Sequence, residues 1–205
     1  MERLLTLAAV AAMMAVAGCA NTPLTSKDAA LIDASPGVDT GKVDADGEAD
    51  FLLAYQYVRS APVTTSMPNS GSARYIGGMG TDVSGGINGF MTGAIDATVT
   101  NLNNGSASAV VDNFALYDDS GTKTKDLGGA AILTGAVSGN TLAMSTTTGQ
   151  IVDGANTSTV SMNMNGTFRD ITDSASAVTG SVTTSGTGGF TINPTTGKFY
   201  LVEND

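Results

Sequence analysis

The chain has 205 residues and a formal net charge of -10, and it contains no histidine, no tryptophan and one cysteine. The lack of histidine excludes His-containing catalytic triads and metal sites, and one cysteine cannot form an internal disulfide or a four-cysteine cluster. With nine Lys plus Arg, the acidity opposes binding to nucleic-acid phosphates, and the length predicts a single folded domain.

Residues 1–18 have the organisation of a secretory signal peptide. A short polar start precedes an apolar run from Leu4 to Val16, which is interrupted only by Thr6. A permanent transmembrane helix needs about 20 apolar residues, so this shorter run predicts the hydrophobic region of a signal peptide.

The end of this segment, Val16-Ala17-Gly18-Cys19, is similar to the bacterial lipobox. The resemblance implies cleavage between Gly18 and Cys19 and attachment of acyl chains such as palmitate to Cys19; more than one acyl chain anchors a protein stably to a membrane. Ala20, in place of an aspartate, implies sorting to the outer membrane, facing the cell surface or the periplasm. The alternative is an ordinary signal peptide in which the cysteine is incidental or a buried structural thiol.

Residues 19–50 predict a lipidated, acidic and flexible tether, because they combine proline, glycine, serine and aspartate with little apolar periodicity. Within this range, the alternating acidic residues of Asp44–Asp50 invite a calcium-site interpretation. A helix-flanked calcium loop requires glycine at its sixth position and glutamate at its twelfth. Ala49 and Tyr55 occupy those positions, so we predict no metal site.

Residues 51–205 predict an ordered, all-β domain. Phe51–Val58 could form a strand or a short helix, since apolar runs this short allow both. After it, period-two alternation and turn residues indicate strands at 91–100, 106–117, 131–137, 141–147, 159–165, 178–182, 190–192 and 197–202. We expect tight turns at Asn103–Gly105, Asp118–Gly121 and Pro194–Gly197. This pattern favours an antiparallel sandwich or barrel.

Alternation also predicts which side chains share a face. Val160, Met162, Met164 and Phe168 have the same parity on one predicted strand. Methionine is a common filler of hydrophobic cores, so we interpret this face as core, with a soft-metal or haem site as the less favoured alternative. In the same way, Ala97, Ala107, Ala109 and Ala136 would give the domain a lean interior. The residues leave open whether that interior is filled or holds a small ligand.

The chain resembles the small C-terminal barrel of transferrin-binding protein B over roughly residues 73–185. The resemblance is carried by Tyr75-Ile76-Gly77, Asn103-Asn104-Gly105, 106–114, 133–142, Gly166-Thr167-Phe168 and Val178-Thr179-Gly180. It implies an antiparallel up-and-down barrel of about eight strands behind a lipid anchor and a flexible N-terminal stretch. Arg169-Asp170-Ile171 follows Phe168 where the family has a Phe-Tyr-Gly-Pro-like turn, and the handle domain is missing, so transferrin binding is not carried over.

No catalytic, cofactor-binding or metal-binding residues are predicted. Asp112, Asp153, Asp170 and Asp173 are the strongest candidates for acid-base chemistry, but no spacing pairs them and no tryptophan supplies a sugar platform. We therefore expect a protein that is not an enzyme. The resemblance keeps one alternative, in which Tyr75 or a methionine ligates haem.

These features favour an outer-membrane-anchored lipoprotein that acts as a binding module in nutrient capture, of iron, haem or another small solute. Its expected partners are the membrane, through the lipid on Cys19, and a host or environmental protein or a small molecule. Loops at 118–126 and 153–158 would form the contact surface, because loops on a rigid scaffold commonly do. The alternative is a structural or adhesion lipoprotein of the envelope with no specific ligand.

Overall fold

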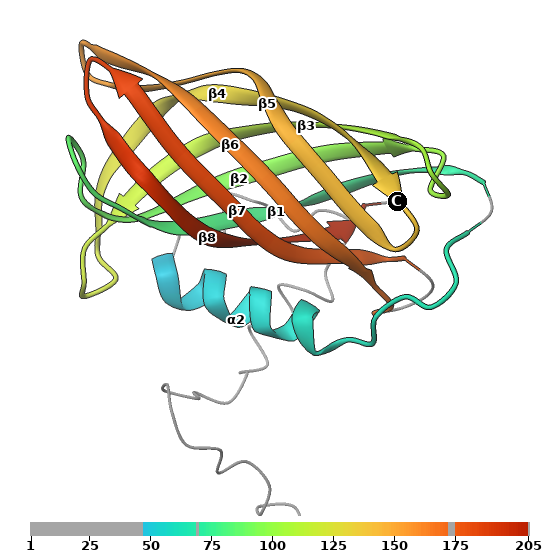
Figure 1. Cartoon of the computed structure of the whole chain (residues 1–205). Helices are drawn as coiled ribbons and strands as arrows, with labels where there is room; N and C mark the ends of the chain where they lie inside the picture. The colour runs from blue at the N-terminus through green and yellow to red at the C-terminus, as the bar shows by residue number, and fades with distance from the viewer. Residues whose placement is uncertain (1–46, 69, 172–174, 205) are drawn as a thin grey trace, which may run out of the picture.

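The computed structural model describes residues 47–68, 70–171 and 175–204, which form one closed antiparallel barrel with a helix on its outside (Figure 1). The helix is α2 (Gly47–Ser60). The strands are β1 (Ser72–Val83), β2 (Gly89–Thr100), β3 (Ser106–Tyr117), β4 (Lys123–Ser138), β5 (Thr141–Asp153), β6 (Asn156–Arg169), β7 (Ala177–Gly188) and β8 (Ile192–Glu203). Each strand pairs with its neighbour in sequence, and β8 pairs back with β1. The predicted eight-stranded up-and-down barrel is confirmed.

The β2–β3 hairpin shows how the turn residues direct the chain. Asn101 and Asn104 adopt the left-handed conformation, each with φ of 62°, which asparagine tolerates better than most residues. At the next position only glycine fits, because a Cβ on Gly105 would lie 1.8 Å from the carbonyl oxygen of Thr100. The predicted turn at Asn103–Gly105 therefore forms part of a slightly longer connection.

Two predictions about strands were incomplete or wrong. The strand β1 was missed, because Gly77, Gly78 and Gly80 weaken its alternation. The predicted turn at Pro194–Gly197 is wrong, since β8 runs without interruption through these residues and the chain reverses between β7 and β8 at residues 189–191. Proline is tolerated there because it lies near the start of β8, beside a register shift in the β7–β8 pairing.

Phe51–Val58 forms a helix, not a strand, and α2 begins at Gly47, inside the range predicted as tether. Phe51, Tyr55 and Val58 are spaced by four and three residues, so they share one helix face, and all three are buried. This face packs on the outer wall of the barrel, along β8, β7, β1 and β2 (Figure 1). Among the described residues, no helix combines the length and apolar character needed to span a membrane.

The contact between α2 and the barrel is a small second core. The ring of Phe51 lies 5.9 Å, centroid to centroid, from the rings of both Phe90 and Tyr200. A Cβ on Gly80 would lie 2.5 Å from the ring of Phe90 and 2.6 Å from that of Phe51. The glycine that weakens the alternation of β1 thus allows the helix to approach the sheet closely.

The barrel interior is filled by its own side chains. Side chains that are 0% exposed include Met79, Met91, Leu133, Met162, Met164, Phe168, Val182, Phe199 and Leu201. A cavity wide enough for a water molecule would expose part of the side chains that line it, so no such space lies against these residues. On β6 the predicted face is confirmed, with Val160, Met162, Met164 and Phe168 all buried.

The small interior residues were predicted correctly with one exception. Ala97, Ala107 and Ala109 are buried in the main core. Ala136 is exposed instead, and its neighbour Val137 faces inward. Leu133, Gly135 and Val137 share the inward parity on β4, so the larger apolar side chain takes the interior position.

Candidate functional site

The segment between α2 and β1 crosses one end of the barrel. We call residues 61–68 the strap, and the end that carries the β2–β3 and β4–β5 turns and the β6–β7 loop the strapped end. The backbone N–H of Thr64 donates to the carbonyl of Phe168 at 3.0 Å, and Asn140 Nδ2 donates to the carbonyl of Thr64 at 3.2 Å. Met67 packs against the main core. The strap therefore belongs to the folded domain.

Asp170 ties the strap to the β6–β7 loop. Its Oδ1 accepts hydrogen bonds from the Thr64 hydroxyl and, at 2.9 Å, from the backbone N–H of Ala175. The backbone N–H of Asp170 donates to the carbonyl of Pro62 at 3.0 Å. Next to it, Arg169 Nη1 donates to the carbonyl of Ala61 at 2.9 Å. Arg169 and Asp170 thus hold the strap against the end of β6.

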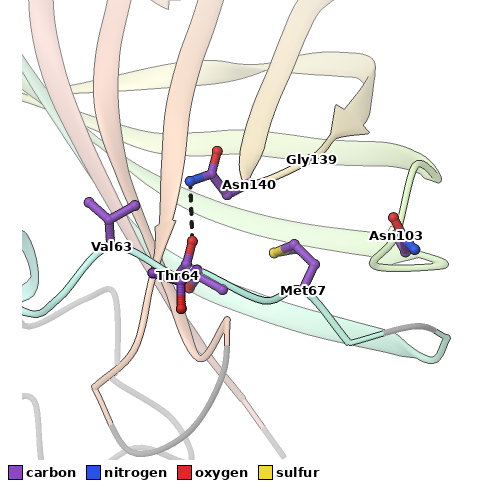
Figure 2. Close-up of a pocket in the computed structure, with 7 residues that line it drawn as sticks. Val63, Thr64, Met67, Asn103, Gly139 and Asn140 are labelled. Carbon is purple, nitrogen blue, oxygen red and sulfur yellow. Dashed lines mark hydrogen bonds between the residues drawn. The ribbon is translucent and has the colours of Figure 1, made fainter.

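A cleft of about 440 Å³ opens between the strap and the turns of the strapped end (Figure 2). It is lined by Val63, Thr64, Thr65, Met67, Asn103, Gly139 and Asn140. None of these residues carries an ionisable side chain. Val63 is 41% exposed, which makes it one of three exposed large apolar residues in the described part of the chain. The cleft therefore offers an apolar wall beside amide and hydroxyl groups.

The candidate carboxylates do not form a site. Asp170 lies at the strapped end. Asp153 lies at the opposite end of the barrel, where it pairs with Lys125 at 2.9 Å. Asp112 is at the middle of the barrel wall, in β3. Asp173 lies outside the described residues. The structure thus brings no two of the three described carboxylates together as an acid-base pair.

The candidate ligands for haem or a soft metal are buried in the packed interior. Tyr75 is fully buried, its hydroxyl donates to the carbonyl of Ala175 at 2.8 Å, and its ring packs edge-on against Phe168. Met162 and Met164 are fully buried in the same core. Across the residues that the structure describes, no three His, Cys, Asp or Glu side chains gather where they could hold a metal ion.

The loops predicted as a contact surface lie at the end opposite the strap, and their charges are largely satisfied locally. Asp118 Oδ1 accepts hydrogen bonds from the Ser120 hydroxyl at 2.6 Å and the Thr122 backbone N–H at 2.9 Å. These bonds, chiefly the one from Ser120, hold the pKa of Asp118 below its ordinary value. Lys123 pairs with Asp126 in the same loop region.

The predicted cleavage and lipidation residues, Gly18 and Cys19, lie outside the described residues, as does most of the predicted tether. Comparisons with models of protein families, with curated proteins and with solved structures found no match to this chain. Any assignment of function therefore rests on the residues and on the geometry of the domain.

Sequence reasoning missed the strap and its cleft. Residues 61–71 show neither helical nor strand periodicity, and the cleft combines side chains from positions near 63, 103 and 140. The one local signal is a pair of isolated apolar residues, Val63 and Met67, between Pro62 and Pro68. That signal indicates an extended segment with apolar contacts, but it does not say against what.

Proposed function

We propose that the chain is an outer-membrane-anchored lipoprotein whose barrel is a non-enzymatic binding module, built on the plan of the single C-terminal barrel of transferrin-binding protein B. The observation that carries this proposal is Val16-Ala17-Gly18-Cys19, which follows an apolar run in a chain with no other cysteine. A lipid on Cys19 would fix the domain to the membrane through the acidic tether, leaving the barrel in the aqueous phase.

Two features of the domain support binding at its outer surface. The packed interior favours contact with a partner over capture of a solute inside the barrel, because a solute would have to displace fully buried side chains. The cleft at the strapped end is a concave, uncharged surface of a size common for binding sites. The separation of Asp153 from Asp170 supports a role other than catalysis. In nutrient capture, the partner would be a host or environmental protein that carries the nutrient.

The anchoring part is tested by Cys19→Ala in cells. We expect the unaltered protein in the outer-membrane fraction with the added mass of acyl chains, and we expect the variant to lose that mass and leave the membrane. An unchanged distribution and mass in the variant would contradict the lipoprotein assignment. For the binding part, the full-length protein should enrich a discrete protein from culture medium.

A structural or adhesion role is the second candidate, favoured by the uncharged part of the barrel wall that β6 and β7 form. No charged residue occurs from Asn156 to Phe168 or from Ala177 to Gly188, and the exposed positions of β6 and β7 carry threonine, serine, asparagine and, at the end of β7, glycine. Such a wall suits close packing in the envelope without charge repulsion. This role predicts that the same capture experiment enriches no discrete protein.

A further inference from the structure

The strap presents an open strand edge at the strapped end. Val63 lies opposite Arg169 as an isolated antiparallel bridge. The hydrogen bonds of this bridge come from the flanking residues: Thr64 N–H donates to the Phe168 carbonyl, and Asp170 N–H donates to the Pro62 carbonyl, both at 3.0 Å. In a pair of this kind, the N–H and C=O of the central residue point away from the partner strand. The backbone groups of Val63 therefore point away from β6.

The open edge faces the cleft. Phe168 donates its N–H to the carbonyl of Asn140 at 2.9 Å and accepts at its carbonyl from Thr64, and both groups of one strand residue point to the same side. The strap thus continues along β6 on the side of β5, beyond the β4–β5 turn. The next strand position outward from Val63 lies beside Gly139 and Asn140, which line the cleft with it (Figure 2).

The N–H and C=O of Val63 have no hydrogen-bond partner in the described residues. A free donor and a free acceptor on one extended residue are complemented by another extended backbone, which supplies an acceptor and a donor at the same spacing. Val63 as a residue is 41% exposed, and Met67 is half-buried in the same cleft. These side chains offer apolar contact to a residue of the added segment.

We propose that the cleft binds an extended, uncharged peptide segment of a partner protein as an added strand paired with Val63. The segment is uncharged because no lining residue carries an ionisable group that could pair with a charge removed from water. It carries an apolar side chain at the position that contacts Val63. This inference rests on the proposed function, because it names the class of partner that the binding module takes.

The proposal is tested with two phage-displayed libraries of ten-residue peptides, selected on the full-length protein in detergent micelles. One library contains only uncharged residues, and the other also contains lysine and glutamate. We expect binders from the uncharged library, with leading peptides that protect the backbone N–H of Val63 from hydrogen exchange. Failure of the uncharged library to yield any binder at tens of micromolar, or binders that all depend on a charged residue, would overturn the proposal.

Backbone pairing is tested on both partners. N-methylation of a selected peptide should weaken its binding at least tenfold at alternate positions only, since alternate residues of a strand face the edge. Val63→Pro removes the N–H and should weaken binding at least tenfold, while slow exchange of the Thr64 N–H shows that the strap is still in place. Equal tolerance of N-methylation at every position would refute strand addition without relying on any protein variant.

The apolar contact has a matched control on the barrel wall. Val63→Ala should weaken peptide binding several-fold, whereas Val110→Ala, at a 40% exposed residue within β3 that does not line the cleft, should leave it unchanged. Capture of a partner from culture medium distinguishes failure of the edge assignment from failure of the proposed function. Capture that survives Val63→Pro overturns the edge assignment and leaves the binding module standing, whereas capture of nothing discrete by the unaltered protein overturns the proposed function.

Discussion

Whether the barrel is filled can be tested by shortening one interior side chain. Met162 is fully buried at the middle of β6, and Met164 on the same face pairs across the strands with Met144. In a packed core, replacing methionine by alanine removes buried apolar surface and leaves a cavity, at a cost of about 2–5 kcal/mol. For a domain of this size, about 2–4 °C is lost per kcal/mol, so we expect Met162→Ala to lower Tm by about 4–20 °C.

The assays are thermal unfolding, which gives Tm, and urea unfolding, which gives the free energy of unfolding, both of the full-length protein and followed by circular dichroism, with Asn163→Ala as the control. Asn163 is the next residue of the strand and is exposed, so its replacement should change the free energy of unfolding by no more than about 0.5 kcal/mol. The cavity in Met162→Ala should also bind benzene or xenon, as dry engineered cavities do. A cost below about 1 kcal/mol for Met162→Ala would refute the packed interior and would restore solute binding inside the barrel as a function.

Two further predictions concern the outer wall. Gly80→Val should lower the free energy of unfolding by about 1–3 kcal/mol, because the new side chain would displace the ring of Phe51. Hydrogen exchange should become faster in α2 but not in the barrel strands. Unchanged exchange in α2 would contradict the close packing. The hydrogen bond from Arg74 holds the pKa of Asp96 below its usual range. The pair therefore stabilises the fold fully above pH about 4, and this contribution is lost as the pH falls through the lowered pKa of Asp96. Arg74→Gln should therefore be less stable than the unaltered protein at pH 7 and equally stable in strong acid, as measured by urea unfolding against pH; a difference that does not change with pH would exclude this linkage.

The strands that were predicted well are those in which tertiary structure and local pattern agree. On β6, every second side chain enters the interior, so Val160, Met162 and Met164 could be assigned to the core from parity alone. β1 was not predicted because Gly80, which interrupts its alternation, is required by the close packing of the helix outside the strand. That contact is long-range, so the local sequence pattern does not indicate it. The sequence also did not decide whether Phe51–Val58 is a helix or a strand, because its apolar helix face is buried only by contact with the barrel wall.

The cleft could not have been predicted from the sequence, because it is produced by closure of the barrel. Val63, Asn103 and Asn140 meet only after the β2–β3 and β4–β5 turns reach the same end of the sheet. Asp170 was recognised as a notable carboxylate, but its chemistry alone does not distinguish a catalytic group from a hydrogen-bond acceptor. Its contacts with Thr64 and Ala175 give it the second role in this structure.

One end of the strap contacts the packed interior of the barrel, and the other end carries the open strand edge at Val63. Met67 packs against the core, while Val63, four residues earlier, is 41% exposed and its backbone groups have no hydrogen-bond partner in the described residues. Two backbone hydrogen bonds, with Phe168 at the end of β6 and with Asp170 just after it, already hold this part of the strap in an extended conformation. A segment that pairs with Val63 thus binds to an edge that is already formed, and the barrel loses little conformational freedom on binding. Most of the entropic cost of binding therefore comes from ordering the segment itself. We therefore expect binding to protect the strap from hydrogen exchange while the exchange of the interior strands stays unchanged.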